Sequence, residues 1–526
     1  MSDGMSWWRG AVVYHIYVRS FFDSDGDGHG DLPGVLAKLG YIKALGVDAV
    51  WLSPVHPSPN RDWGYDVSDY EGVHPDYGTT ADLEALIDAA HGKGIKILMD
   101  EVLAHTSDEH AWFADSRDGG DKKDWYVWAP LKDDGTAPNN WLSAFGGPAW
   151  AYQPLRKAAY HHKFLRVQPK LNWRHPDARA AALNVLDHWL SKGVDGFRLD
   201  VANAFLHDDT LTDNPVEHAD AGWRWSAAAN FQKHWNDSNL VENIETLADV
   251  RRTVDAHKDR FVFGEFSEEA ARSGGFAAPD EGLHAGYSFP LLHASKLSPA
   301  FIRKHFAALA EHPDHWPCIS FSNHDVPRTV SRFGGDGHEP GLAKLMLALL
   351  LAVRGTILIY QGEELGLPEA DLTREQLRDP VGDLYWPAHK GRDGCRTPMP
   401  WQADAPNLGF SAGQTWLPAA PEHAHLTADA QEADAASPLA FARALIALRA
   451  AEPTLRLGDI EFQDAPEPVL AFTRELGESV ILCVFNMSGE TQGLTGAGLH
   501  MGATLLQTGD ITARSLGPYA VRIAKL

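Results

Sequence analysis

Cysteine is scarce in this sequence. The 526 residues include three cysteines, Cys318, Cys395 and Cys483. An odd number at wide spacing argues against a disulfide framework and matches no metal-binding knuckle. We therefore expect reduced, mostly buried thiols in a chain that is long enough to build a large core without cross-links.

Basic residues are also few in proportion to acidic ones. There are 46 Lys and Arg against 71 Asp and Glu, so the formal net charge is −25. This excess repels phosphate backbones and anionic lipid surfaces, and we expect neither nucleic acid nor membrane as a partner. A neutral substrate remains compatible with this charge.

Long hydrophobic runs are missing as well. The most apolar stretch, residues 345–353, is bracketed by Lys344 and Arg354 and is too short to cross a bilayer. It predicts a buried helix. Residues 1–9 lack the basic start and apolar run of a secretory signal, so a cytoplasmic location is expected.

Aromatic residues, by contrast, are plentiful. Eighteen tryptophans occur, several in polar surroundings: Trp63, Trp112, Trp125, Trp128, Trp141 and Trp150. Flat apolar rings beside polar groups suit the faces of sugars, and ordinary core packing is the alternative for any one of them.

Short β-branched runs alternate with helical patterns over the first two-thirds of the chain, which is typical of βα units around a parallel sheet. The predicted strands span residues 12–20, 49–53, 95–102, 196–201, 261–266, 319–322 and 356–360, with a weak sixth strand around 287–291. Eight such units favour an α/β fold of the (β/α)₈ TIM-barrel type over an open sheet.

Two regions interrupt or follow this rhythm. Residues 105–173 are too long for a loop after strand 3 and predict an inserted subdomain. Strand-like runs from about residue 455 predict a C-terminal all-β sandwich domain. The expected division is therefore 1–104 and 174–454 for the barrel, 105–173 for the insert and 455–526 for the β domain.

Polar residues lie at or just past the carboxyl ends of five of the predicted strands. They are Asp100, Asp200, Glu265, His324, Asp325 and Glu363. In a TIM barrel the carboxyl ends of the strands carry the active site.

A retaining glycosidase needs two carboxyl groups about 5–5.5 Å apart, one attacking and one donating a proton. Asp200 and Glu265 would end the fourth and fifth strands. Arg198 lies on the same face as Asp200 by strand alternation and would keep it ionised. A structural ion pair is the alternative for Asp200 and Arg198.

Several motifs occur together and in a fixed order. They are Asp62-Trp-Gly-Tyr-Asp66, Asp100-Glu-Val-Leu-Ala-His105, Gly196-Phe-Arg-Leu-Asp200, Gly264-Glu265, Asn323-His-Asp325, Gln361-Gly-Glu-Glu-Leu-Gly366 and Arg392-Asp-Gly-Cys-Arg-Thr-Pro-Met-Pro-Trp401. In this the chain resembles the α-amylase family of glycoside hydrolases, and most of all its α-glucosidase and oligo-1,6-glucosidase branch. The resemblance covers nearly the whole chain.

The resemblance implies roles for the matched positions. Asp200 would be the nucleophile, Glu265 the general acid/base and Asp325 a third carboxylate that grips sugar hydroxyls. The implied substrate-binding residues are Asp62, Tyr65, His105, Arg198, His324 and Arg396, with Tyr65 stacking on the sugar and an Asp62–Arg396 pair closing the far end of the pocket. The sequence departs from the family pattern at Ala104, where Asn is usual, and at Lys170, where Asp is usual.

Residues 23–31 alternate carboxylates with small residues, which lets a tight loop wrap oxygen atoms around a hard cation. The candidate ligands are Asp23, Asp25, Asp27, Asp31 and the His29 carbonyl. Ca²⁺ is favoured and Mg²⁺ is the alternative, as is an acidic turn without metal. The resembled branch has similar loops that hold a structural ion.

The sequence thus predicts a retaining, exo-acting α-glucosidase that takes glucose from short oligosaccharides, with transglucosylation as an additional outcome. Val201, directly after the nucleophile, resembles α-1,6-cleaving members. A sucrose hydrolase, a glucosyltransferase and a trehalose-cleaving enzyme share the same machinery. A non-catalytic binding subunit is disfavoured because all three carboxylates are present.

Overall fold

A parallel sheet of eight strands forms the centre of the computed structural model, which describes residues 6–217, 228–266, 276, 282–334, 339–494 and 502–526. Its strands are β1 (Val12–Ile16), β2 (Ala49–Leu52), β3 (Lys96–Glu101), β7 (Gly196–Leu199), β8 (Phe261–Phe266), β9 (Ala285–Ser288), β10 (Cys318–Ile319) and β11 (Thr356–Tyr360). They are ordered β10-β11-β1-β2-β3-β7-β8-β9. A parallel bridge between Gly286 and Pro317 joins the two edges, so the predicted barrel is confirmed.

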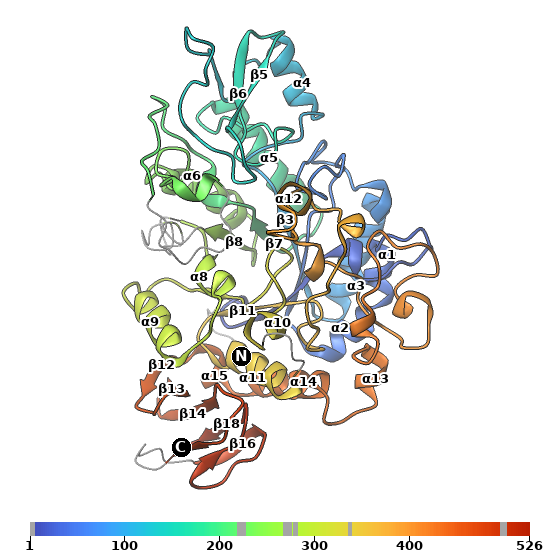
Figure 1. Ribbon diagram of the computed structural model, residues 1–526, viewed down its shortest axis with the longest axis vertical. Coiled ribbons are helices and arrows are strands. Elements are labelled where there is room, and N and C mark those ends of the chain that lie inside the picture. Colours follow the sequence, from blue (N-terminus) through green and yellow to red (C-terminus); the bar gives the residue numbers. More distant parts are fainter. Residues whose placement is uncertain (1–5, 218–227, 267–275, 277–281, 335–338, 495–501) are drawn as a thin grey trace.

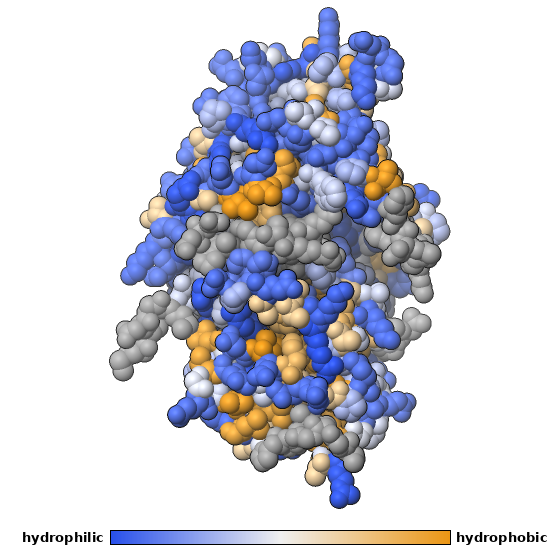
Figure 2. All heavy atoms as spheres, turned by 90° about the vertical axis from the view of Figure 1, so that its left-hand side faces the viewer, coloured by the Kyte–Doolittle hydropathy of each residue, from blue (hydrophilic) through white to orange (hydrophobic). Residues whose placement is uncertain are grey.

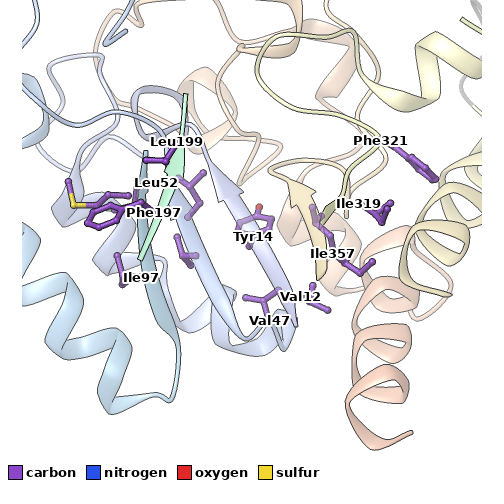
Figure 3. Close-up of a cluster of buried hydrophobic side chains, with 14 of the residues drawn as sticks. Val12, Tyr14, Val47, Leu52, Ile97, Phe197, Leu199, Ile319, Phe321 and Ile357 are labelled. Carbon is purple, nitrogen blue, oxygen red and sulfur yellow. The ribbon is translucent and has the colours of Figure 1, made fainter. Parts of the chain in front are cut away.

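Both faces of these strands are buried. Val12 and Tyr14 pack in the cluster between the strands and the outer helices, whose members from several strands are drawn in Figure 3. Val13, between them, packs inside the barrel with Trp51 and Leu98. This two-residue alternation between two apolar environments explains why the strands read as nearly continuous apolar runs.

The sixth strand was predicted two residues too late. The strand is β9 (Ala285–Ser288), and the expected residues 289–291 belong to helix α8 (Phe289–His293). Pro290 has no N–H to give to a β-ladder but is tolerated in the first turn of a helix. The strand therefore ends before it.

Helices surround the barrel. The main ones are α1 (Leu32–Ala37), α2 (Leu39–Leu45), α3 (Thr80–Gly92), α5 (Pro176–Ser191), α6 (Asn243–Asp255), α9 (Pro299–Ala310), α10 (Thr329–Gly334), α11 (Pro340–Ala352) and α14 (Pro438–Ala451), with the short α12 (Pro380–Tyr385), α13 (Ala428–Glu432) and α15 (Pro453–Leu457). Sequence signals start many of them: Thr79 and Asp82 form a capping box at α3. The apolar run around residue 345 is the buried helix α11, as predicted.

The insert and the C-terminal domain lie at opposite ends of the molecule, at the top and bottom of Figure 1. The insert holds α4 (Ala111–Asp118) and the sheet β4 (Trp128–Ala129), β6 (Ala158–His161) and β5 (Trp150–Gln153). The C-terminal domain has the antiparallel order β12 (Asp459–Gln463), β13 (Val469–Leu476), β14 (Ser479–Asn486), β18 (Val521–Lys525) and β16 (Ala503–Thr508), beside the pair β15 (Gln492–Gly493) and β17 (Ser515–Leu516).

The surface and the thiols agree with the composition. Hydrophilic side chains predominate over the upper part of the face in Figure 2, at the height of the insert. All three cysteines are free and buried, as expected. Among the described residues, no helix has the length and hydrophobicity that a membrane crossing requires.

Candidate active site

Asp200 and Glu265 occupy neighbouring positions at the carboxyl end of the barrel. Leu199 of β7 pairs with Gly264 of β8, so the two acidic residues come next on adjacent strands. Both are buried, and the N–H of Val201 donates to Glu265 Oε2 at 3.2 Å. The parallel register therefore brings together the two carboxylates that the sequence predicted.

Arg198 is the common partner of this group. Its Nη1 donates to Asp200 Oδ1 at 2.8 Å and to Asp100 Oδ1 at 2.7 Å, while Nη2 lies 2.7 Å from Glu265 Oε2. The Tyr287 hydroxyl accepts from Nη2 at 3.0 Å. A single fully buried guanidinium thus faces three carboxyl groups, and contact with its two terminal nitrogens limits how far apart Asp200 and Glu265 can lie.

Three carboxyl groups around one guanidinium favour a state in which Asp200 and Glu265 share one proton. Burial raises the pKa of Asp200 to about 7, with the carboxylates of Asp100 and Asp325 adding to the effect and Arg198 opposing it. Burial likewise raises the pKa of Glu265 to about 7. Because ionising one carboxyl makes it harder to ionise the other, the pair holds a proton near neutral pH. One attacking carboxylate and one proton donor require that state.

Asp325 is held in the opposite state. Arg396 Nη2 donates to its Oδ1 at 2.7 Å, Arg392 Nη1 donates to the same oxygen at 3.2 Å, and His324 Nε2 lies 3.2 Å from Oδ2. Although burial opposes ionisation, these neighbours set the pKa of Asp325 well below its usual range. It is therefore an ionised carboxylate at neutral pH, beside the catalytic pair.

The expected Asp62–Arg396 pair is wrong. Asp62 Oδ1 accepts instead from Arg392 Nη2 at 2.7 Å, and its Oδ2 accepts from Gln168 Nε2 at 3.0 Å. Arg396 is committed to Asp325 and to the carbonyl of His324, at 2.7 Å each. The two arginines are four residues apart in the sequence, and it is Arg392 whose side chain binds Asp62.

The remaining predicted binding residues surround the same space. The Tyr65 ring stacks on the His324 ring with centroids 5.1 Å apart, and its hydroxyl donates to Asp100 at 3.0 Å. His105 Nε2 lies 2.8 Å from the Tyr65 carbonyl, and burial lowers the pKa of His105 to about 4, so the ring is neutral.

Some buried polar atoms here lack a hydrogen-bond partner within the described part of the chain. They include Nδ1 of His324, Arg396 Nη1 and the Tyr17 hydroxyl. Buried polar groups are costly to leave unsatisfied. A ligand with many hydroxyl groups would satisfy them.

Sequence reasoning missed several members of this site. Arg392, Tyr287 and Gln168 each contact a predicted residue, yet none was in the predicted set. Asp100 was expected at a strand end of the active site but was given no role, and it binds Arg198. Arg392 opens a motif that was recognised, and its charge four residues before Arg396 was the available signal. Glu363, which follows β11, accepts from Thr329 and from the Tyr360 N–H instead of joining the carboxylate group.

The acidic loop before α1 brings three of its predicted ligands together. Carboxylate oxygens of Asp23, Asp25 and Asp27 lie within 4.8 Å of one another, which is a donor set suited to a hard divalent cation. Asp31 has a different position: it accepts from Ser24 and caps α1 through the Gly34 N–H. The His29 carbonyl remains a predicted ligand.

The model of the alpha amylase catalytic domain matches residues 15–458. A probable alpha-glucosidase from Rhizobium meliloti is 46% identical over 92% of this chain and 90% of its own length. An oligo-1,6-glucosidase from Parageobacillus thermoglucosidasius is 35% identical over 92% and 91%.

Solved structures agree. The alpha-glucosyl transfer enzyme XgtA is 45% identical and superposes with a TM-score of 0.94 over 99% of both chains. The trehalulose synthase MutB is 31% identical, with a TM-score of 0.90 over 99% of this chain and 100% of its own. The fold, the paired carboxylates and these matches together place the chain in the α-amylase family of glycoside hydrolases.

Proposed function

We propose that the protein is a retaining, exo-acting α-glucosidase that releases glucose from the non-reducing end of short α-glucosides. One observation carries the proposal: Asp200 and Glu265 contact the same guanidinium, that of Arg198, and Asp325, whose pKa is lowered, lies nearby as a carboxylate. Two closely held carboxyls sharing a proton are the requirement of the double-displacement reaction. The names of the relatives from Rhizobium meliloti and Parageobacillus thermoglucosidasius support the substrate class.

In the first step Asp200 attacks the anomeric carbon while Glu265 gives its proton to the leaving oxygen. In the second, water attacks the same carbon while Glu265 takes a proton from it, and the bond to Asp200 breaks to release glucose. Arg198 stabilises whichever carboxyl is charged. Asp325, His324 and Arg396 would bind hydroxyls of the same sugar, where the unpartnered polar atoms lie.

The blind end of the pocket would be closed by Asp62 and Arg392. Arg392 also binds Asp379 Oδ1 at 2.8 Å and Asp325 at 3.2 Å, so one partly buried arginine joins three acidic residues from different loops. A longer chain could not continue past this group. Cleavage of one glucose at a time follows.

Transfer to a sugar acceptor shares the first step of this mechanism, since any hydroxyl can replace water in the second. The likeness to an enzyme described as glucosyl-transferring supports this as an additional activity. A sucrose-, trehalose- or transfer-preferring enzyme would differ only in the acceptor side of the pocket.

We also propose a structural divalent cation, Ca²⁺ in preference to Mg²⁺, at Asp23, Asp25 and Asp27. Three convergent carboxylates repel one another, and a cation with flexible oxygen coordination would remove that cost. The free, buried thiols are typical of a reducing compartment and support a cytoplasmic location.

Two measurements test the main proposal. Proton NMR of a fresh digest should show α-glucose as the first product, and initial β-glucose would exclude retention. A panel of maltose, isomaltose, sucrose and trehalose should give the highest kcat/KM on a glucose disaccharide. Preference for sucrose or trehalose would move the protein to one of the alternative activities.

A further inference from the structure

Lys170 is a buried lysine whose ammonium contacts no carboxylate within hydrogen-bonding distance among the described residues. It is 2% exposed, and its Nζ donates to the backbone carbonyls of Ala204 and, at 3.2 Å, Phe205. Those carbonyls end the 3-10 turn η3 (Ala202–Ala204), which begins two residues after Asp200. An ammonium at the end of the insert therefore reaches the loop that carries the proposed nucleophile.

The backbone of Lys170 is itself fixed. It forms an antiparallel bridge with His105, and its N–H donates to the His161 carbonyl at 2.9 Å. The side chain thus extends from a rigid point beside the β3 loop to the β7 loop. One residue joins a predicted sugar-binding segment to the nucleophile segment.

The turn after Asp200 has a strained backbone, which requires contacts that fix it. Val201 has φ +37° and ψ +48°, in the left-handed region that a β-branched residue rarely adopts. In this conformation its N–H points to Glu265 Oε2 at 3.2 Å. A strained backbone persists only where surrounding contacts determine it. On one side Asn243 Nδ2 donates to the Ala202 carbonyl at 2.7 Å, and on the other Lys170 binds the last carbonyls.

We propose that Lys170 is a positioning residue for the nucleophile, whose ammonium binds the carbonyls of Ala204 and Phe205 and so fixes the turn that aligns Asp200 with Glu265. The proposal rests on the proposed role of Asp200. An aspartate, which is usual here in the resembled family, could not donate to these oxygens. The lysine supplies both the donors and the positive charge.

Among the described residues, the charged neighbours of the Lys170 ammonium do not bind it, so the carbonyls of Ala204 and Phe205 are its hydrogen-bond partners. Lys163 and Arg174 are the cationic neighbours that oppose its charge, and Asp237 is the acidic one that favours it. The titratable rings of His161, His207 and His105 are also near, and burial lowers the pKa of each, so they are neutral. The Asp237 carboxylate is occupied by Lys163 at 3.1 Å and His234 at 2.9 Å. Burial, then these cations, lower the pKa of Lys170 to about 7. The anchor therefore weakens as pH rises above neutrality.

The test compares Lys170→Met, Lys170→Gln and Lys170→Arg with the wild type. The readout is the rate at which 5-fluoro-α-glucosyl fluoride labels Asp200, followed by intact mass and located by peptide mapping. Lys170→Met should slow labelling at least about tenfold, because small misplacements of a reacting group are costly. KM for p-nitrophenyl α-glucoside should change far less than kcat, and Lys170→Arg should restore most of the rate.

Lys163→Met is the matched control, since it removes a neighbouring ammonium that binds Asp237 and not the turn. It should lower the melting temperature without slowing labelling. Lys170→Met labelled at the wild-type rate would overturn the proposal, even with a lower melting temperature. If Lys170→Met does not fold, equal rates for Lys170→Gln and Lys170→Arg would overturn it instead. A wild type that is labelled elsewhere than at Asp200 would refute the proposed function and not this inference alone.

Discussion

At the scale of single residues, Asp200 and Glu265 have nearly the same surroundings and different tasks. Asp200→Asn replaces the attacking carboxylate with a neutral amide, which is a poor nucleophile, and we expect kcat to fall by about 10⁴-fold or more with the fold intact. Glu265→Gln should cost about 10²–10⁴-fold on disaccharides and far less on p-nitrophenyl α-glucoside, whose leaving group needs no proton. Steady-state rates on both substrates check this, with circular dichroism as the folding control. Equal losses on the two substrates would contradict the assignment of Glu265.

The shared proton predicts the pH profile. Since both carboxyl groups have pKa values raised to about 7, kcat/KM should fall as pH rises above neutrality and the pair loses its proton. It should also fall on the acid side, where the second carboxyl takes a proton and Asp200 can no longer attack. In Glu265→Gln, assayed with p-nitrophenyl α-glucoside, the alkaline limb should disappear. An alkaline limb unchanged in that variant would assign it to another group.

Val201 couples backbone strain to substrate choice. It directly follows the nucleophile in the sequence, and we expect a larger apolar side chain at this position to favour one acceptor pose over another. Val201→Thr should lower the isomaltose-to-maltose ratio of kcat/KM by an amount equivalent to about 1–3 kcal/mol. The ratio, measured on both disaccharides, is independent of the active enzyme fraction. An unchanged ratio would remove Val201 from the linkage preference.

At the scale of elements, the acidic loop ties several segments together. Asp23 donates its backbone N–H to the Phe410 carbonyl, Trp416 donates its backbone N–H to the Gly28 carbonyl, and Asp31 caps α1. A cation bound there would stabilise the folded chain by about 2.7 kcal/mol at a hundredfold excess over Kd. Excess chelator should therefore lower the melting temperature while activity at moderate temperature changes little.

Asp25→Asn should reproduce the effect of chelator, and Asp121→Asn, an exposed acidic residue of the insert, should not. Elemental analysis of the purified protein gives the identity of the ion. A melting temperature that does not respond to chelator, with no metal found, would leave the loop as an acidic turn.

Elements whose signals are local could be predicted from the sequence. The strands at Ala49, Phe261 and Thr356 were placed within a residue at their starts, because each apolar run begins directly after charged or glycine residues. The strand β9 was misplaced because its apolar run continues into the helix α8 and Pro290 was the only break. Strand β10 is two residues long, too short for any periodicity.

At the scale of the whole molecule, the limit of sequence reasoning was the pairing of distant charges. The barrel register fixes Asp200 against Glu265, so that contact followed from the fold alone. Asp62, Arg392 and Arg396 lie on loops whose paths the sequence does not determine, and either arginine could have faced Asp62. The motifs thus identified which residues belong to the site, but they did not determine which of the charged residues pair with one another.

At the scale of the whole pocket, the closed end determines the length of the substrate. Arg392 closes its far end by binding Asp62, Asp379 and Asp325, and all three acidic residues lose a partner if it is removed. A site closed in this way admits one terminal glucose, so maltotriose should be hydrolysed to glucose while starch stays nearly inert. Asp62→Asn should raise KM for disaccharides, because the end wall loosens, whereas Asp371→Asn, in an exposed pair with Lys390, should not. Product analysis by chromatography and starch viscosity measure both. A rapid fall in viscosity with mixed oligosaccharide products would show an open cleft, and the closed-pocket reading of the Asp62–Arg392 pair would then be wrong.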